Sequence, residues 1–141
     1  MDLRKTIPRV ATGIFLFNED KILIFKSHKW NNQYCVPGGH VDFGETTQEC
    51  VIRETKEETG VNITNPKLIK ISQCIFPKDF YEKRHFIFYN YIAKTNETNV
   101  ILNEEAQEYE WVSLNKVLEF DLGQPTQDMI KQIIRENLIN K

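Results

Sequence analysis

The sequence predicts a mixed α/β (α+β) sandwich in which helices pack on a mixed β-sheet. Most of its apolar segments are short and rich in β-branched or aromatic residues, which is typical of strands. One central and one C-terminal segment instead carry helix-end signals and helical spacing. The length of 141 residues, with 40% hydrophobic and 27% charged residues, suits one compact domain. We therefore expect a single domain over residues 1–141.

The first half of the chain predicts a β-hairpin, a glycine-containing loop and a helix. Turn residues at 18–21 separate two strand-like segments. Pro37-Gly38-Gly39 predicts a loop whose backbone can approach a ligand closely. Thr46 or Thr47 is the expected N-cap of the helix, and Gly60 its C-terminal stop. The expected elements are strands at Val10–Phe17 and Ile22–Phe25, a short apolar stretch at Tyr34–Val36, and a helix ending near Thr59.

The second half predicts three more strands and two helices. Polar and apolar residues alternate in the last strand, which indicates that it is half-buried. An apolar stripe along the last helix indicates a face that packs on the sheet. The stripe consists of Ile130, Ile133, Ile134 and Leu138. The expected elements are strands at Leu68–Phe76, Phe86–Ala93 and Glu108–Val112, a short helix at Leu114–Phe120 and a longer helix at Thr126–Leu138.

The charge balance disfavours several classes of partner. Eighteen basic and 20 acidic residues give a net charge of -2, without the basic excess typical of nucleic-acid or acidic-membrane binding. Residues 1–11 do not resemble a signal peptide, and no apolar run approaches a membrane span. Three cysteines with no zinc-site spacing indicate thiols in a reducing compartment. We expect a cytoplasmic protein, and the sequence does not decide between a monomer and a homodimer.

Three carboxylates gather on one face of the central helix. At about 100° per residue, Glu54, Glu57 and Glu58 share an arc of roughly 100°. Like charges this close repel each other, so the arrangement favours a bound cation that takes oxygen ligands. A solvated acidic helix face is the alternative, because glutamate is a good helix former.

The residues around these carboxylates form a longer pattern that resembles the Nudix box. The resemblance extends to Pro37-Gly38-Gly39, to the hairpin before it and to the later strand around Trp111. It implies an α/β/α sandwich around a mixed sheet, with the box as a loop-helix-loop. Thr55 departs from the aliphatic residue usual there, which we expect to affect packing and not chemistry. The matching positions are Gly39, Glu45, Arg53-Glu54, Glu57-Glu58, Gly60 and Val61.

The resemblance also implies a metal-dependent catalytic site. Glu54, Glu57 and Glu58 would be the metal ligands, with the backbone carbonyl of Gly38 as a further one. Mg²⁺ is the expected ion and Mn²⁺ its substitute, because both take oxygen ligands and Mg²⁺ accompanies phosphate substrates.

Two further residues of the box have alternative roles. Arg53 would orient a ligand carboxylate, or would form only a surface ion pair with Glu57. Glu45 would either help to bind metal or brace the loop before the helix. The general base would be a box glutamate or a later carboxylate, and the later candidates are Glu104, Glu105, Asp121 and Asp128.

The other end of the substrate needs cationic and aromatic contacts. Basic side chains would contact phosphate, aromatic side chains would stack on a base, and Asp121 is a further substrate-binding candidate. The cationic candidates are Arg9, Lys29 and Arg84, with Lys26 and Lys83, and the aromatic candidates are Trp30 and Tyr81, with Phe80.

The resemblance implies hydrolysis of a diphosphate linkage in a nucleoside diphosphate joined to some group X. The segments 103–112 and 120–122 look like those of small bacterial nucleoside triphosphatases of the family. They favour a (deoxy)nucleoside triphosphate cut to monophosphate and pyrophosphate. ADP-ribose or a nucleotide sugar is the alternative, suggested by Pro77. A non-catalytic nucleotide-binding or regulatory module is an alternative of another class.

Overall fold

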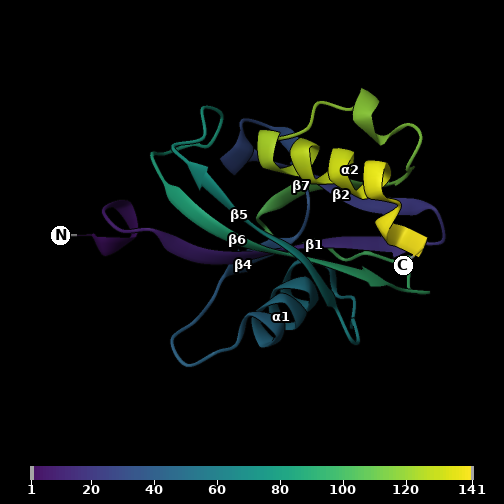
Figure 1. The fold of residues 1–141 in the computed structure, drawn as a ribbon, viewed down its shortest axis with the longest axis horizontal. Coiled ribbons are helices and arrows are strands. Elements are labelled where there is room, and N and C mark those ends of the chain that lie inside the picture. Colours follow the sequence, from purple (N-terminus) through teal and green to yellow (C-terminus); the bar gives the residue numbers. More distant parts are fainter. Residues whose placement is uncertain (1, 141) are drawn as a thin grey trace.

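The computed structural model describes residues 2–140, and it places two helices on opposite faces of a seven-stranded mixed sheet (Figure 1). Helix α1 (Thr47–Thr59) covers one face and α2 (Gln124–Glu136) the other. The predicted sandwich is therefore confirmed. The strands are β1 (Arg9–Asn18), β2 (Lys21–Ser27), β3 (Gln33–Cys35), β4 (Gly38–His40), β5 (Lys67–Ile75), β6 (His85–Lys94) and β7 (Ala106–Ser113).

Strand β1 is the centre of the sheet, and the sheet divides along one of its edges. One edge of β1 pairs with β6 in parallel, from Arg9↔Phe86 to Phe17↔Lys94. The other edge pairs antiparallel with β4 near its start and with β2 near its end. β2 continues outward to β3 and β7, whereas β5 completes the opposite side beside β6.

The alternation of side chains along β1 supplies both cores. Phe15 and Phe17 pack with Ile130 and Ile133 of α2 in one cluster. Ile14 and Leu16 pack with Val51 of α1 in the other cluster. Because successive strand residues point to opposite faces, one apolar strand can hold both helices.

Helix α1 has strong end signals, and its bounds follow from the sequence. The Thr46 side chain accepts a hydrogen bond from Glu49 N, and the Glu49 side chain accepts one from Thr46 N, so both parts of a capping box are present. Gly60 ends the helix in the left-handed region at φ 78°, where glycine is favoured. Thr46, of the two predicted candidates, is therefore the N-cap.

Three predicted features of the fold are corrected. Gly38 and Gly39 lie in the short strand β4 and not in a loop, because β4 pairs with β1. The short helix predicted near residues 114–120 is only the 3-10 turn Val117–Glu119. Helix α2 begins two residues early, at Gln124, and within its predicted stripe Ile134 is 40% exposed. The remaining 3-10 turns are Leu3–Lys5, His28–Trp30 and Leu138–Asn140.

The Thr55 hydroxyl is buried and forms a hydrogen bond only within its own helix. Its side chain is fully buried and donates to the Val51 carbonyl at 2.6 Å. That carbonyl lies one turn back and can accept a backbone N–H without the hydroxyl. We predict that Thr55→Val raises the free energy of unfolding by about 0.5–1 kcal/mol, because a buried hydroxyl is exchanged for a methyl group. Chemical denaturation measures the change, and unchanged turnover should accompany it.

Thr59→Val is the matched control. Thr59 is equally buried and donates to Thr55 O in the same way, but its hydroxyl also accepts a hydrogen bond from Val61 N at 3.1 Å. Its removal leaves a buried N–H unpaired, so this variant should lose about 1–2 kcal/mol. Equal effects of the two substitutions would contradict the distinction.

Candidate active site

The three carboxylates of α1 lie in three different environments. The Glu58 residue is 2% exposed, because it borders the core-facing side of the helix. The Glu54 side chain is 15% exposed and that of Glu57 54%. Among the residues that the structure describes, no three His, Cys, Asp or Glu side chains are already arranged around one metal position. The structure thus brings Glu54 and Glu58 together, while Glu57 lies outside and pairs with Arg53.

Glu54, which is partly buried, and Glu58, which is buried, form a pair of carboxyl groups that carry like charges when ionised. Burial raises the pKa of both carboxyl groups, and the neighbouring Glu54 charge raises that of Glu58 further. Glu58 Oε2 accepts a hydrogen bond from Gly38 N at 3.3 Å, whereas Glu58 Oε1 is buried without a hydrogen-bond partner. An unpaired buried carboxylate oxygen is costly, and a hard divalent cation would satisfy it. The residues present therefore fit a Mg²⁺-type ion, which Glu54 and Glu58 would hold.

Two glycines let the backbone of β4 reach this pair. A side chain at Gly38 would overlap the Thr12 carbonyl of β1, and one at Gly39 would overlap the Glu54 carboxyl group. The Gly38 peptide thus contacts the carboxylate pair through its N–H, while the predicted role of its carbonyl stays a prediction. Neighbouring atoms approach both positions too closely for any side chain, so glycine is required at each. The sequence predicts this close approach, but it occurs in a strand and not in a loop.

Arg53 joins the carboxylates to the loop before α1. Its Nε donates to Glu45 Oε2 at 2.7 Å, and its Nη1 donates to Glu54 at 3.0 Å and to Glu57 at 3.2 Å. Its Nη2 donates to the His40 carbonyl at 3.2 Å and to Glu45 Oε1 at 3.0 Å. These contacts exceed the surface ion pair that was the alternative and favour an orienting role for Arg53.

Glu45 is positioned by Arg53 and by the loop itself. The guanidinium and the Asp42 N–H, which donates at 3.0 Å, lower the pKa of Glu45 to about 2. Its two oxygens are thereby occupied in the structure. Of the two predicted roles, the contacts favour bracing the loop over binding metal.

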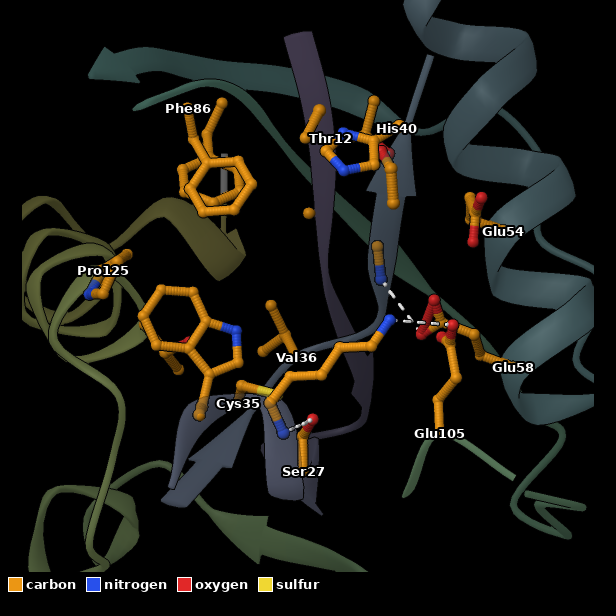
Figure 2. Close-up of a pocket in the computed structure, with 18 of the residues that line it drawn as sticks. Thr12, Ser27, Cys35, Val36, His40, Glu54, Glu58, Phe86, Glu105 and Pro125 are labelled. Atoms are coloured by element: carbon orange, nitrogen blue, oxygen red, sulfur yellow. Dashed lines mark hydrogen bonds and ion pairs between the residues drawn. The ribbon is translucent and has the colours of Figure 1, made fainter. Parts of the chain in front are cut away.

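A cavity of about 270 Å³ extends from the carboxylates to an aromatic wall. Figure 2 shows Glu54 and Glu58 on one side of it and Phe86 and Pro125 on the other. The cavity is lined by both branches of the divided sheet and by the start of α2. Its aromatic lining comprises Phe15, Phe25, Trp30, Phe80, Phe86 and Phe88.

The cavity contains three of the predicted substrate-binding residues, Lys29, Trp30 and Phe80. Lys29 and Trp30 line it, and Trp30 packs against Phe80 with ring centroids 4.8 Å apart. Lys29 Nζ also pairs with Glu105 at 3.1 Å (Figure 2). Tyr81 is 58% exposed and does not line the cavity, whereas its neighbour Phe80, also a predicted aromatic candidate, does.

Arg9 and Arg84 act at the edge of the cavity without lining it. Burial lowers the pKa of His40 to about 4, and the charges of Arg9, Arg84 and Lys29 contribute to the shift. His40 also lines the cavity, and its lowered pKa favours the neutral imidazole near neutral pH. Arg84 is buried and pairs with Glu82 at 2.6 Å, which leaves its Nε and Nη1 without hydrogen bonds.

The predicted general bases separate in space. Glu105 lines the cavity, whereas Asp128 lines a different groove, between β5 and α2. Asp121 is exposed, accepts a hydrogen bond from Gln33 and does not line the cavity, and Glu104 is also exposed and outside it. The structure therefore favours Glu105 among the later carboxylates.

Sequence reasoning missed one wall of the cavity. Phe86, Phe88 and Asn90 of β6 share the face that lines it, and Pro125 and Thr126 of α2 complete the lining. The alternation within the predicted strand contained this signal, since positions 86, 88 and 90 must share a face. What the sequence could not supply was which face of β6 lines the cavity.

Known proteins match the chain over most of its length. A family model described as NUDIX domain matches residues 7–133. The chain is 31% identical to an ADP-ribose pyrophosphatase of Methanocaldococcus jannaschii, over 81% of this chain and 68% of the relative. It is 26% identical to the Nudix hydrolase YvcI of Bacillus subtilis, over 76% of this chain and 67% of the relative. The structure of a MutT protein from Methanosarcina mazei matches with a TM-score of 0.80 and 25% identity. The match covers 92% of this chain and 95% of the MutT chain.

These matches cover the box, the sheet and most of both helices. The chain therefore belongs to the NUDIX domain family and is a Nudix hydrolase. Enzymes of this family work with divalent metal ions on small nucleotide substrates. Within the described residues, no helix has the length and apolar character needed to cross a membrane.

The burial of Glu58 predicts a stability effect with a defined sign. A carboxyl group whose pKa is raised by folding favours the folded state below its unfolded pKa of about 4.3, and this advantage is lost as the pH rises through the folded pKa. In metal-free buffer at pH 7, Glu58→Gln should raise the free energy of unfolding by an amount on the order of 1 kcal/mol, because a buried charge is removed.

Thermal denaturation at several pH values tests this prediction. The advantage of Glu58→Gln should shrink as the pH falls through the raised folded pKa of Glu58, because the wild-type carboxyl group then takes up its proton. Added Mg²⁺ should stabilise the wild type more than the variant, since ligand binding favours the folded state. A variant that is less stable than the wild type at pH 7 without metal would contradict the prediction.

Proposed function

We propose that the chain hydrolyses the diphosphate linkage of a nucleoside diphosphate-X substrate, specifically that of a (deoxy)nucleoside triphosphate, to give the monophosphate and pyrophosphate. One observation carries the proposal: the aromatic cavity ends at Glu54 and at the unpaired Oε1 of Glu58. A flat ring on the aromatic wall would place a phosphate chain at the carboxylates. At about 270 Å³ the cavity suits one nucleoside better than both halves of a dinucleotide.

The metal is proposed to be Mg²⁺, with Mn²⁺ as a substitute. When bound, a divalent cation neutralises phosphate charge and makes water a better nucleophile. Glu54 and Glu58 would hold it, and Glu57 would join them on leaving Arg53, since its side chain is exposed. Arg53 keeps Glu54 in place through its 3.0 Å hydrogen bond.

The remaining chemistry is assigned to the lining of the cavity. Lys29 lies beside Glu105, with 3.1 Å between Nζ and Oε1, and both line the cavity. Figure 2 shows Glu105 near Glu58. Lys29 would contact a phosphate oxygen. Glu105 would then accept the proton of the attacking water as general base.

ADP-ribose or a nucleotide sugar is a second candidate substrate. One observation favours it: the relative from Methanocaldococcus jannaschii, 31% identical over 81% of this chain, is named an ADP-ribose pyrophosphatase. The aromatic wall would accept adenine equally well in either case. The two candidates differ in the group that leaves after cleavage.

Turnover of a nucleotide panel tests the function. Purified protein with Mg²⁺ should release pyrophosphate from at least one nucleoside triphosphate, or ribose phosphate from ADP-ribose. Chelation should abolish either activity, Mn²⁺ should restore it and Ca²⁺ should support little turnover, because its coordination is looser. Glu54→Gln and Glu57→Gln should each lose about 10²-fold or more in kcat while keeping the fold.

Two results of this experiment would overturn parts of the proposal. Release of no product from any substrate would favour the binding-module alternative. Near-native turnover of either glutamine variant would remove that residue from the set of metal ligands. Circular dichroism of each variant serves as the control for folding.

We also predict that kcat rises above pH 7. The pKa of His40 is lowered to about 4, so this histidine carries no proton that could be transferred near neutrality. Deprotonation of the attacking water increases with pH, so the rate should climb. A rate profile from pH 5 to pH 10 checks this, and a sharp maximum near pH 6 with the fold intact would point to a histidine instead.

A further inference from the structure

Asn90 is a buried amide at the floor of the cavity, outside the Nudix box. It lies on β6 between β5 and β1, is 5% exposed and lines the cavity. Its Nδ2 donates to the Lys70 carbonyl at 3.2 Å and to Ser72 Oγ at 3.0 Å, both on β5. Because a carbonyl can only accept, the amide nitrogen must face Lys70, and the orientation of the side chain is settled.

Because the amide nitrogen of Asn90 faces β5, only its amide oxygen is available to the cavity. An amide NH₂ has two donors, and both are used on β5. Oδ1 therefore points the other way, toward Gly13 of β1, and it has no hydrogen-bond partner among the described residues. Unlike Glu58 Oε1, it is not sealed from solvent, which places it at the cavity surface. Asn90 thus offers an acceptor there and no donor.

Gly13 keeps the space in front of this acceptor open. Gly13 pairs with Asn90 across β1 and β6 and also lines the cavity. A Cβ at this position would lie 3.6 Å from Asn90 Oδ1 and 3.7 Å from Val36, both ordinary contacts, and its φ is not positive. Neither packing nor backbone conformation therefore requires glycine here. A glycine inside a strand often marks the close approach of a ligand.

The surroundings indicate which ligand meets the acceptor. Phe86 and Phe88 precede Asn90 on the same face of β6, with ring centroids 5.0 Å apart, and Trp30 and Phe80 complete the aromatic wall. A flat ring lying on this wall would place its edge at Oδ1. We propose that Asn90 is a specificity-determining residue, whose Oδ1 accepts a hydrogen bond from a ring-edge N–H or amino group of the substrate base. The inference rests on the proposed function, since it takes a nucleotide as the occupant.

Binding of nucleoside monophosphates tests the proposal without catalysis. The probes are the adenosine, guanosine, cytidine and thymidine monophosphates, and the nucleotides of unsubstituted purine and 2-pyrimidinone, which lack the ring-edge N–H. The wild type should bind its preferred natural nucleotide about 10- to 100-fold more tightly than the N–H-free parent, because the parent leaves a buried acceptor unpaired. The Asn90→Leu variant should bind the natural nucleotide and its N–H-free parent with nearly equal affinity, because only the affinity for the natural nucleotide falls.

Gly13→Ala is the second variant and does not depend on Asn90 tolerating substitution. Its methyl group should leave thermal stability unchanged or raised, because a strand glycine is replaced without a clash. It should weaken binding of the preferred nucleotide by about tenfold or more, because it fills the space in front of Oδ1. Ser72→Ala serves as the control, since the bond to Lys70 still orients the amide and discrimination should persist.

Several outcomes would overturn the proposal. They are equal weakening of both ligands by Asn90→Leu, absence of discrimination in the wild type, unchanged binding by Gly13→Ala, and no nucleotide binding at all. Turnover is scored separately on the same nucleotide panel. Discrimination without hydrolysis would refute the proposed activity and leave this inference standing, whereas hydrolysis without discrimination would do the reverse.

Discussion

One guanidinium group joins the three segments that surround the candidate active site. Arg53 bonds to Glu45 in the loop, to Glu54 and Glu57 on α1, and to the His40 carbonyl at the end of β4. Its five donors in a rigid fork let a single residue fix a loop, a helix and a strand at once. A lysine could not do this, because it is a point charge on a flexible stem.

The buried carboxylate pair depends on this arrangement. Two like charges out of water cost free energy, and α1 offsets this by its capped start, its left-handed glycine end and its packing on the β1 face. Glu58 keeps one oxygen on Gly38 N and the other unpaired. The unpaired oxygen indicates a site that is complete only when a cation is present. The metal-free fold is therefore less stable locally, and the same oxygen favours binding of a cation.

Different parts of the molecule were predictable from sequence to different degrees. The bounds of α1 were predictable because capping residues and Gly60 act locally, and the helical arc placed the three carboxylates on one face. The arc could not show that Glu57 turns to Arg53 while Glu58 is buried, because that depends on β4 and the loop. Tyr81 and Asp121 do not line the cavity, and their positions depend on loop paths that periodicity does not specify.

The division of the sheet explains why cleavage and recognition can vary separately. The carboxylates sit on α1, on one face of the sheet, whereas Asn90, Phe86 and Phe88 face α2 on the other. The carboxylates and the β6 residues share one cavity because β4 and β2 pair with the same edge of β1 at different points along that strand. A substitution on β6 can therefore change the shape and polarity of the aromatic end without touching Arg53 or its partners. On our proposal, the box would act on the bond to be cut, and the face of β6 would select the group attached to it.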